Sequence, residues 1–381
     1  MAKLTFNPYE NVNFLNTNEV KANLHAHSTD CHGQAHPHEV IDKYVEAGGF
    51  GALALTSHNR VSYNWQFATS PLWDKRRKPE WEDRDPEALG MIAIPGNEVN
   101  GVHHMNLLWK NDYDPRPNND FRRGLDPVPP GDLFYDWEWH IEPALDLAEQ
   151  DEGTAENPKA IIYFSHPGRY WDVTKKDYEK GEYFSLEWYL SWFVRYSSDS
   201  LIGIEVFNDD NLYPYDTVLW DMLLTHLMPK RTVFGLAGDD YHASGLYGID
   251  WSVVRFFING ETTKTKLREA MVKGQFVSSY TKQRTTIPPL LECVDVDENK
   301  KTITITTDKS DLVRWVSGYK WDEGKGRYDS NVVGLGNVFD YKGFDKNYVR
   351  AEIIESETRR TILQPFGFER AEPDREPVIK V

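Results

Sequence analysis

Histidines gather near the start of this chain. Five of its twelve histidines lie within the sixteen residues NLHAHSTDCHGQAHPH, residues 23–38. His25 and His27 are two positions apart at the end of an apolar run with strand character, so their side chains should point the same way and could bind one ion together. A His-x-His pair taken by itself is equally well a chance surface feature. The placement of the other ionisable residues has to decide whether this pair binds a metal ion or is a surface feature.

Those other residues lie at the ends of further apolar runs. They are His58, Glu98, His166, Glu205, Asp239, Asp240 and His242. The simpler interpretations are a turn histidine at His166 and turn-forming aspartates at 239 and 240. Independent accident does not readily put so many metal-capable side chains in equivalent positions. Imidazole and carboxylate ligands without cysteine suit Zn, Mn or Fe better than Mg or Ca alone, so the pattern predicts a site for such a cation.

The elements that must position these residues are βα units. Short apolar runs followed by polar turns and helical patterns recur through the first two thirds of the chain. We expect strands over residues 20–26, 50–57, 91–99, 104–109, 160–166, 201–208, 232–238 and 251–257. The C-terminal ends of parallel barrel strands emerge on one face, so side chains scattered along the sequence would converge there. Seven or eight strands with helical crossovers favour such a barrel over an open sheet.

Helices are expected over 37–48 and 217–228. His36 and His38 then stand at the start of a helix, where a surface role is ordinary. Two charged, proline-bearing inserts, 71–87 and 111–132, are expected to form loops over one face.

The pattern changes after about residue 259. A helical segment precedes alternating Thr and Ile residues near 302–307 and two alternating runs within 348–366. We expect a barrel domain over 1–258, a connecting helix and linker over 259–285, and a smaller β-sandwich domain over 286–381.

Composition limits the class of partner that we expect. The formal net charge of the 381 residues is −17, which argues against an electrostatic grip on nucleic-acid backbones or anionic membranes and favours small substrates and cations. No apolar run has the length of a signal peptide or a membrane span, so a cytoplasmic location is expected. Cys31 and Cys293 form no CxxC pattern, which indicates neither a disulfide framework nor a thiolate zinc knuckle.

The ordered motifs carry a resemblance to a known family. HAHSTDCHG, ALALTSHN, GNEVNGVHHMNLL, FSHPG, IEVFN and LAGDDYH resemble, in this order, the motifs of the PHP superfamily, named for polymerase and histidinol phosphatase domains. The resemblance covers about residues 20–258 and implies a distorted (β/α)7 barrel, similar to a TIM barrel, with a two- or three-metal site that hydrolyses phosphoesters. The remaining residues resemble the β-sandwich that follows this barrel in two-domain members.

The resemblance also implies a ligand set. A first metal would be held by His25, His27 and Asp240, Glu98 would bridge it to a second metal, and His104 and His166 would complete the second site. His104 is preferred to His103 because it directly precedes MNLL, as in the family's Gly-His-x-Asn segment.

A third metal site of the family would use His58 and His242 here, but the sequence departs from the motif twice. The usual Ser-Asp-Gly reads Cys31-His32-Gly33, and the usual Thr-Asp-His reads Thr56-Ser57-His58. His32 replaces the carboxylate ligand, or Asp30 reaches in from two residues earlier, or the third site is empty.

The resemblance implies hydrolysis of a small organic phosphate ester, a monoester or a diester, by a hydroxide that bridges two divalent ions. Arg169 would then clamp the phosphate, and His242 or His58 would protonate the leaving oxygen. Glu205 has no matching ligand role and is expected to orient a histidine. Two alternatives stay open at this point: a carboxylic ester, lactone or carbamate hydrolase on the same metals, and a noncatalytic metal-binding interaction module.

Overall fold

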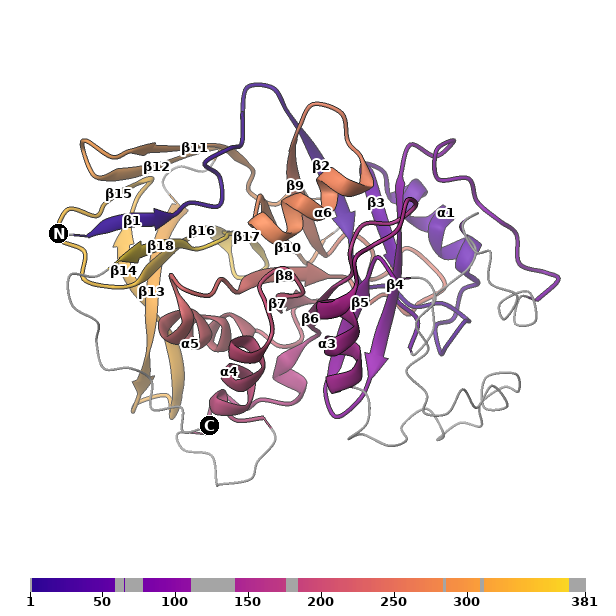
Figure 1. The fold of residues 1–381 in the computed structure, drawn as a ribbon, viewed down its shortest axis with the longest axis horizontal. Helices are drawn as coiled ribbons and strands as arrows, with labels where there is room; N and C mark the ends of the chain where they lie inside the picture. Colours follow the sequence, from indigo (N-terminus) through magenta and orange to yellow (C-terminus); the bar gives the residue numbers. More distant parts are fainter. Residues whose placement is uncertain are drawn as a thin grey trace.

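The computed structural model describes residues 2–58, 65, 78–110, 141–175, 184–283, 286–308 and 312–369 (Figure 1). The predicted insert 111–132 lies outside the described residues, and so does the part 71–77 of the other insert. None of the helices in the described ranges is long and apolar enough to cross a membrane.

Strands dominate the described part of the chain. In chain order they are β1 (Lys3–Phe6), β2 (Thr17–Asn23), β3 (Phe50–Leu55), β4 (Ile92–Asn100), β5 (His104–Leu108), β6 (Ile161–Phe164), β7 (Leu201–Asn208), β8 (Phe234–Gly238), β9 (Ser252–Asn259), β10 (Phe276–Thr281), β11 (Leu291–Asp297), β12 (Thr302–Thr307), β13 (Val313–Asp322), β14 (Arg327–Leu335), β15 (Val338–Asp340), β16 (Tyr348–Ser356), β17 (Arg359–Leu363) and β18 (Phe366–Glu369). The helices are α1 (Pro37–Ala47), α3 (Ile141–Gln150), α4 (Leu186–Arg195), α5 (Asp216–Leu227) and α6 (Lys264–Lys273), with a short 3-10 turn, η4 (Pro167–Arg169).

One large mixed sheet runs through the molecule. Its hydrogen-bonded order is β1-β18-β16-β17-β10-β9-β2-β3-β4-β5-β6-β7-β8, with β13 and β14 joined to it through β16. Strands β2, β3 and β4 are mutually parallel, and so are β6, β7 and β8. Strand β5 departs from the expected parallel arrangement, because it is antiparallel to both β4 and β6. Only residues 101–103 connect β4 to β5, too few for a crossover helix, so β5 must return antiparallel.

The structure is a mixed α/β fold with one large sheet, and over the ranges that it describes it does not show the predicted closed barrel. In the described residues β8 stands at one end of the strand order and β1 at the other, so the sheet does not close by strand pairing. A single parallel bridge between Ala26 and Tyr241 joins the chain after β2 to the chain after β8. A closed barrel therefore stays a prediction.

The C-terminal strands belong mostly to the same large sheet. Only β11, β12 and β15 form a separate, three-stranded sheet. Ile303 and Phe339 of this small sheet share a buried cluster with Trp315 and Ile353 of the large one. The first residues of the chain join them, since β1 pairs with β18. A β-sandwich and the three predicted domain boundaries remain predictions.

His36 and His38 belong to the start of helix α1 and not to the cluster of histidines around Glu98. Pro37 occupies the first turn, and the Glu39 side chain accepts a hydrogen bond from the backbone N–H of His36 at 2.7 Å. The helix buries Val40, Ile41 and Tyr44 against the sheet. His36 instead contacts Trp81, whose indole N–H lies 3.0 Å from its Nδ1.

Candidate metal centre

The buried carboxylate of Glu98, on β4, lies at the middle of the site. Its two oxygens face different imidazoles. Oε2 lies 3.3 Å from His25 Nε2, 3.1 Å from His27 Nε2 and 3.1 Å from His58 Nδ1. Oε1 lies 3.1 Å from His104 Nδ1 and 3.1 Å from His166 Nε2. Five ring nitrogens from separate parts of the chain thus surround one carboxylate, with each oxygen serving its own group.

Asp240, just after β8, supplies a second carboxylate on one side of this cluster. Its Oδ1 lies 3.2 Å from His25 Nε2 and 3.0 Å from His27 Nε2, and its Oδ2 lies 3.9 Å from His166 Nε2. Among the described residues, the groups able to hold an ion include one of His25, His27, Glu98 and Asp240 and another of His58, Glu98 and His104. Glu98 is common to both groups, which is the position of a bridging ligand.

The charges of the cluster favour a cation. Burial opposes ionisation of Glu98 and Asp240, but the neighbouring histidines outweigh it and hold the pKa of both carboxyls well below the usual range. Burial lowers the pKa of His58 and His104, so these rings are neutral. Burial opposes protonation of His25 and His27, but neighbouring groups, Asp240 among them, outweigh it and hold the pKa of both rings well above the usual range. In the absence of metal these two rings therefore carry the positive charge that a divalent ion would supply to the buried carboxylates.

Backbone hydrogen bonds bring the strand ends together. The N–H of His27 donates to Tyr241 O at 2.8 Å, Thr56 N–H to Ala26 O at 2.7 Å, and Glu98 N–H to Thr56 O at 3.1 Å. His104 begins β5, which puts it beside the end of β4 because the two strands are antiparallel. The sequence analysis assigned His104 to the site for another reason, because it directly precedes MNLL as in the family motif.

Two ligand positions have an uncommon backbone conformation. His166 has φ 29° and Asp240 has φ 48°, both in the left-handed region that non-glycine residues seldom adopt. Such strain persists where the surroundings fix it, and it is frequent at functional sites. At the neighbouring Gly238 a Cβ atom would lie 2.5 Å from the Cβ of His25 and 2.8 Å from Glu205 Oε1, so only glycine fits there.

Glu205, on β7, holds two of the candidate ligands in place. Its Oε1 lies 2.8 Å from His25 Nδ1; because a carboxylate only accepts, Nδ1 carries the proton and Nε2 is free to face the centre. Its Oε2 accepts hydrogen bonds from the backbone N–H of His166 at 2.9 Å and from Asn208 Nδ2 at 3.0 Å.

Cys31 faces Nδ1 of His27 much as Glu205 faces Nδ1 of His25, and the sequence did not suggest this contact. Its Sγ lies 3.3 Å from His27 Nδ1. Burial opposes ionisation of the thiol, but His27 outweighs it and holds the pKa of Cys31 well below its usual range. The only signal in the sequence is its position between His27 and His32, and the loop geometry needed to interpret that position is not evident from residue types.

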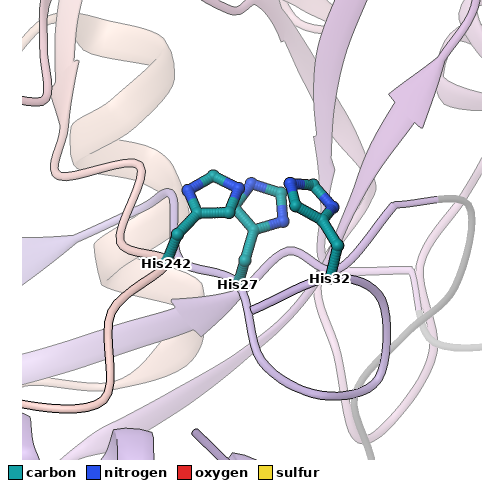
Figure 2. Close-up of side chains that lie close together, drawn as sticks. All are labelled: His27, His32 and His242. Atoms are coloured by element: carbon teal, nitrogen blue, oxygen red, sulfur yellow. The ribbon is translucent and has the colours of Figure 1, made fainter. Parts of the chain in front are cut away.

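A third group of imidazoles lies on the other side of His27. His27, His32 and His242 come together as a possible ligand group, and Figure 2 shows their three rings side by side. The ring centroid of His32 lies 4.5 Å from that of His242 and 4.9 Å from that of His58. Asp30 is buried but belongs to none of the three ligand groups found in the described residues.

His103 points away from the centre. Its Nδ1 donates to His104 O at 2.7 Å, and its Nε2 lies 2.9 Å from the Tyr189 hydroxyl. Of the two adjacent histidines, the structure therefore brings His104 to Glu98. Asp239 is likewise outside the cluster, because its carboxylate accepts backbone N–H bonds from residues 250–252 at 2.9 Å.

Arg169 lies in η4, three residues after His166, and is exposed. Its backbone N–H donates to His166 O at 3.0 Å, and its guanidinium carbon lies 5.8 Å from the Tyr170 ring centroid.

Comparison with known proteins gives similarity of structure only. No protein-family model matches the sequence, and no curated protein matches it. A two-domain protein from Bacteroides vulgatus containing a predicted PHP-like metal-dependent phosphoesterase is 17% identical, covering 95% of this chain and 98% of its own, with a TM-score of 0.42.

Two structures of Endonuclease Q are similar over a shorter region. The lesion-specific enzyme from Pyrococcus furiosus is 14% identical, with a TM-score of 0.39, and a complex with a 27-mer duplex substrate bearing an abasic lesion is 14% identical, with a TM-score of 0.35. Each covers 67% of this chain, whereas this chain spans 56% of the length of each endonuclease chain.

The expectation of a small phosphate ester as partner, with nucleic acid excluded, is contradicted by this comparison, because Endonuclease Q was solved with duplex DNA at its active site. The expectation was based on the net charge of −17. Net charge describes the whole surface, whereas bound ions and nearby side chains set the field at a metal centre. Net charge therefore does not exclude a nucleic-acid partner.

Proposed function

We propose that this protein is a metal-dependent hydrolase of phosphoester bonds. The observation that supports this most directly is the arrangement around Glu98, whose two oxygens each face a separate set of imidazole nitrogens within 3.3 Å. A buried carboxylate placed in this way suits a bridge between two divalent ions, and two-metal sites are typical of phosphoester hydrolysis.

The donor set fits Zn, Mn or Fe, because it combines imidazole with only two carboxylates. In this proposal His25, His27 and Asp240 hold one ion, His104 and His166 hold another, and Glu98 bridges them. His32, His58 and His242 would hold a third ion, as the motifs imply. His32 and His242 form a ligand group with His27, and the His32 ring centroid lies 4.9 Å from that of His58. When bound, such ions activate water as a nucleophile and offset the charge that develops on the phosphoryl group.

The protein's own side chains have the remaining roles. Glu205 keeps the proton of His25 on Nδ1 and orients this ring. We assign to Arg169, three residues after His166, the binding of a nonbridging phosphoryl oxygen through its guanidinium.

We assign protonation of the leaving oxygen to His242 in preference to His58. The His242 side chain is 35% exposed, against 8% for His58. Its Nδ1 donates to the carbonyl of Asp240 at 2.6 Å, so Nε2 carries no proton at first and would take the proton that the attacking water loses before passing it to the leaving oxygen. If a third ion occupies this position, His242 is one of its ligands instead, and metal counting separates the two roles.

The test is hydrolysis of a substrate panel by metal-free protein and by protein reloaded with Mn, Zn or Fe. The panel contains para-nitrophenyl phosphate, bis-para-nitrophenyl phosphate, a duplex oligonucleotide with an abasic site, and para-nitrophenyl acetate. We expect turnover of at least one phosphoester that needs metal and is lost in Glu98→Gln but kept in Glu46→Gln, a change at an exposed residue of α1. Undiminished activity after chelation, or turnover of the acetate alone, would contradict the proposal.

A further inference from the structure

A groove lined by β1 and β11 plays no part in the proposed function. These two strands lie at the end of the molecule opposite α1 (Figure 1). It has a volume of about 400 Å³. Its walls include Leu4, Thr5 and Phe6 of β1 on one side and Val294, Asp295 and Val296 of β11 on the other.

Both walls are strand edges. Successive side chains of a strand point to opposite faces, so a groove that touches three consecutive residues meets the strand along its edge. Within the described residues, β1 pairs only with β18, and β11 pairs only with β12. The two edges that line the groove therefore present backbone N–H and C=O groups without a neighbouring strand, and such edges are templates for a further strand.

The side chains of the groove indicate the charge of its ligand. Glu10, Asp295 and Glu298 line it, all three are exposed, and none forms an ion pair with the residues that the structure describes. Among the described residues, none of those that line the groove is Lys or Arg. Half-buried Phe6 and Val296 add apolar contacts between the acidic positions.

We propose that this groove binds an extended, positively charged peptide segment of a partner protein, which adds a strand along the free edges of β1 and β11. In this mode of recognition the main-chain hydrogen bonds supply affinity, and the alternate side chains supply specificity. A strand with basic residues on one face and small apolar residues on the other satisfies both the acidic side chains and the apolar ones.

The experiment uses the full chain and a fluorescein-labelled heptapeptide, Lys-Val-Lys-Val-Lys-Val-Lys, followed by fluorescence anisotropy. Two further peptides are controls: one has Glu in place of Lys, and one has Pro in place of the central Val, which removes a backbone donor. We expect saturable binding of the Lys peptide, no binding of the Glu peptide, and binding at least about tenfold weaker for the Pro peptide.

The matched protein variants carry equal changes in net charge. Asp295→Lys combined with Glu298→Lys should weaken binding at least about tenfold, whereas Glu46→Lys with Glu269→Lys, on exposed positions of α1 and α6, should leave it unchanged. Hydrogen exchange should also show that the Lys peptide protects amides of β1 and β11.

Several results would overturn the inference. Equal binding of the Lys and Pro peptides, or equal weakening in both pairs of variants, would mean only general attraction to an acidic protein. Absence of peptide binding to the full chain, but binding to a chain lacking residues 370–381, would assign the groove to the chain's own C-terminal segment. Absence of binding to both would remove the site.

Discussion

Substitution of Glu205 by Gln tests whether this residue positions the metal ligands without binding metal itself. The wild-type carboxylate accepts three hydrogen bonds, from His25 Nδ1 at 2.8 Å, the backbone N–H of His166 at 2.9 Å and Asn208 Nδ2 at 3.0 Å. A Gln has one acceptor oxygen, so if this oxygen stays on His25, its NH₂ group faces the two other donors. At least one hydrogen bond to a charged acceptor is lost, which costs about 1.5–3 kcal/mol.

That cost predicts the size of the effect on metal binding. Loss of a partner that orients a ligand typically weakens metal affinity by about 10–100-fold, or roughly 1.4–2.7 kcal/mol, in agreement with the lost hydrogen bond. The measurement is competition for Zn²⁺ or Mn²⁺ with a fluorescent chelator, together with thermal unfolding of the metal-free protein. We expect metal affinity to fall by about 10–100-fold. The metal-free protein should also unfold at a lower temperature, because the same hydrogen bonds are present without metal.

The matched control is Glu352→Gln on β16. Glu352 is also a buried carboxylate, but it pairs with Arg350 and Arg314. This variant should be destabilised and yet bind metal with wild-type affinity. If Glu205→Gln binds metal within about threefold of wild type, or if both variants weaken binding equally, the positioning role of Glu205 is refuted.

Three further predictions concern other parts of the molecule. His104→Ala should lose metal from the centre, whereas His103→Ala, which removes a ring bonded to Tyr189, should keep its metal content and lose stability; metal analysis of both variants checks this. His32→Ala should lower the metal content by one ion per chain if the imidazole group in Figure 2 binds a third metal, and an unchanged content would remove His32 from the site. Burial opposes ionisation of Glu352, but Arg350 and Arg314 lower its pKa from 4.5 to about 2, so its contribution of roughly 3 kcal/mol is present above pH 4.5 and is lost as the pH falls toward 2. Acid unfolding monitored by circular dichroism should show a flatter dependence on pH over this window in Glu352→Gln than in wild type.

Much of the fold follows from local patterns in the sequence. The expected strand over 201–208 coincides with β7, and most of the others up to residue 257 overlap observed strands closely. The strand expected over 20–26 shares only residues 20–23 with β2, so His25 and His27 follow this strand and do not lie on it. Helix α1 begins at Pro37 and ends just before Gly48, as the start and stop signals indicate. These predictions succeed because apolar periodicity and helix capping depend on neighbouring residues.

The parts that were not predictable depend on contacts between distant residues. The antiparallel direction of β5 depends on the connection over 101–103, and pairing of β1 with β18 joins the two ends of the chain. In the site, Glu98 and the histidines around it could be identified from the ordered motifs of the sequence. The thiol of Cys31 beside His27 depends instead on the conformation of the loop that follows β2.

The most direct test of the central claim is the number of metal ions bound per chain. Elemental analysis and anomalous scattering should be applied to wild-type protein and to Glu98→Gln after loading with Zn²⁺ or Mn²⁺. Because Glu98 faces two groups of imidazoles, we expect at least two ions per wild-type chain, placed on either side of this carboxylate, and loss of this pair in the variant. Wild-type protein that binds no ion at Glu98, or a variant that keeps the full number of ions, would contradict it.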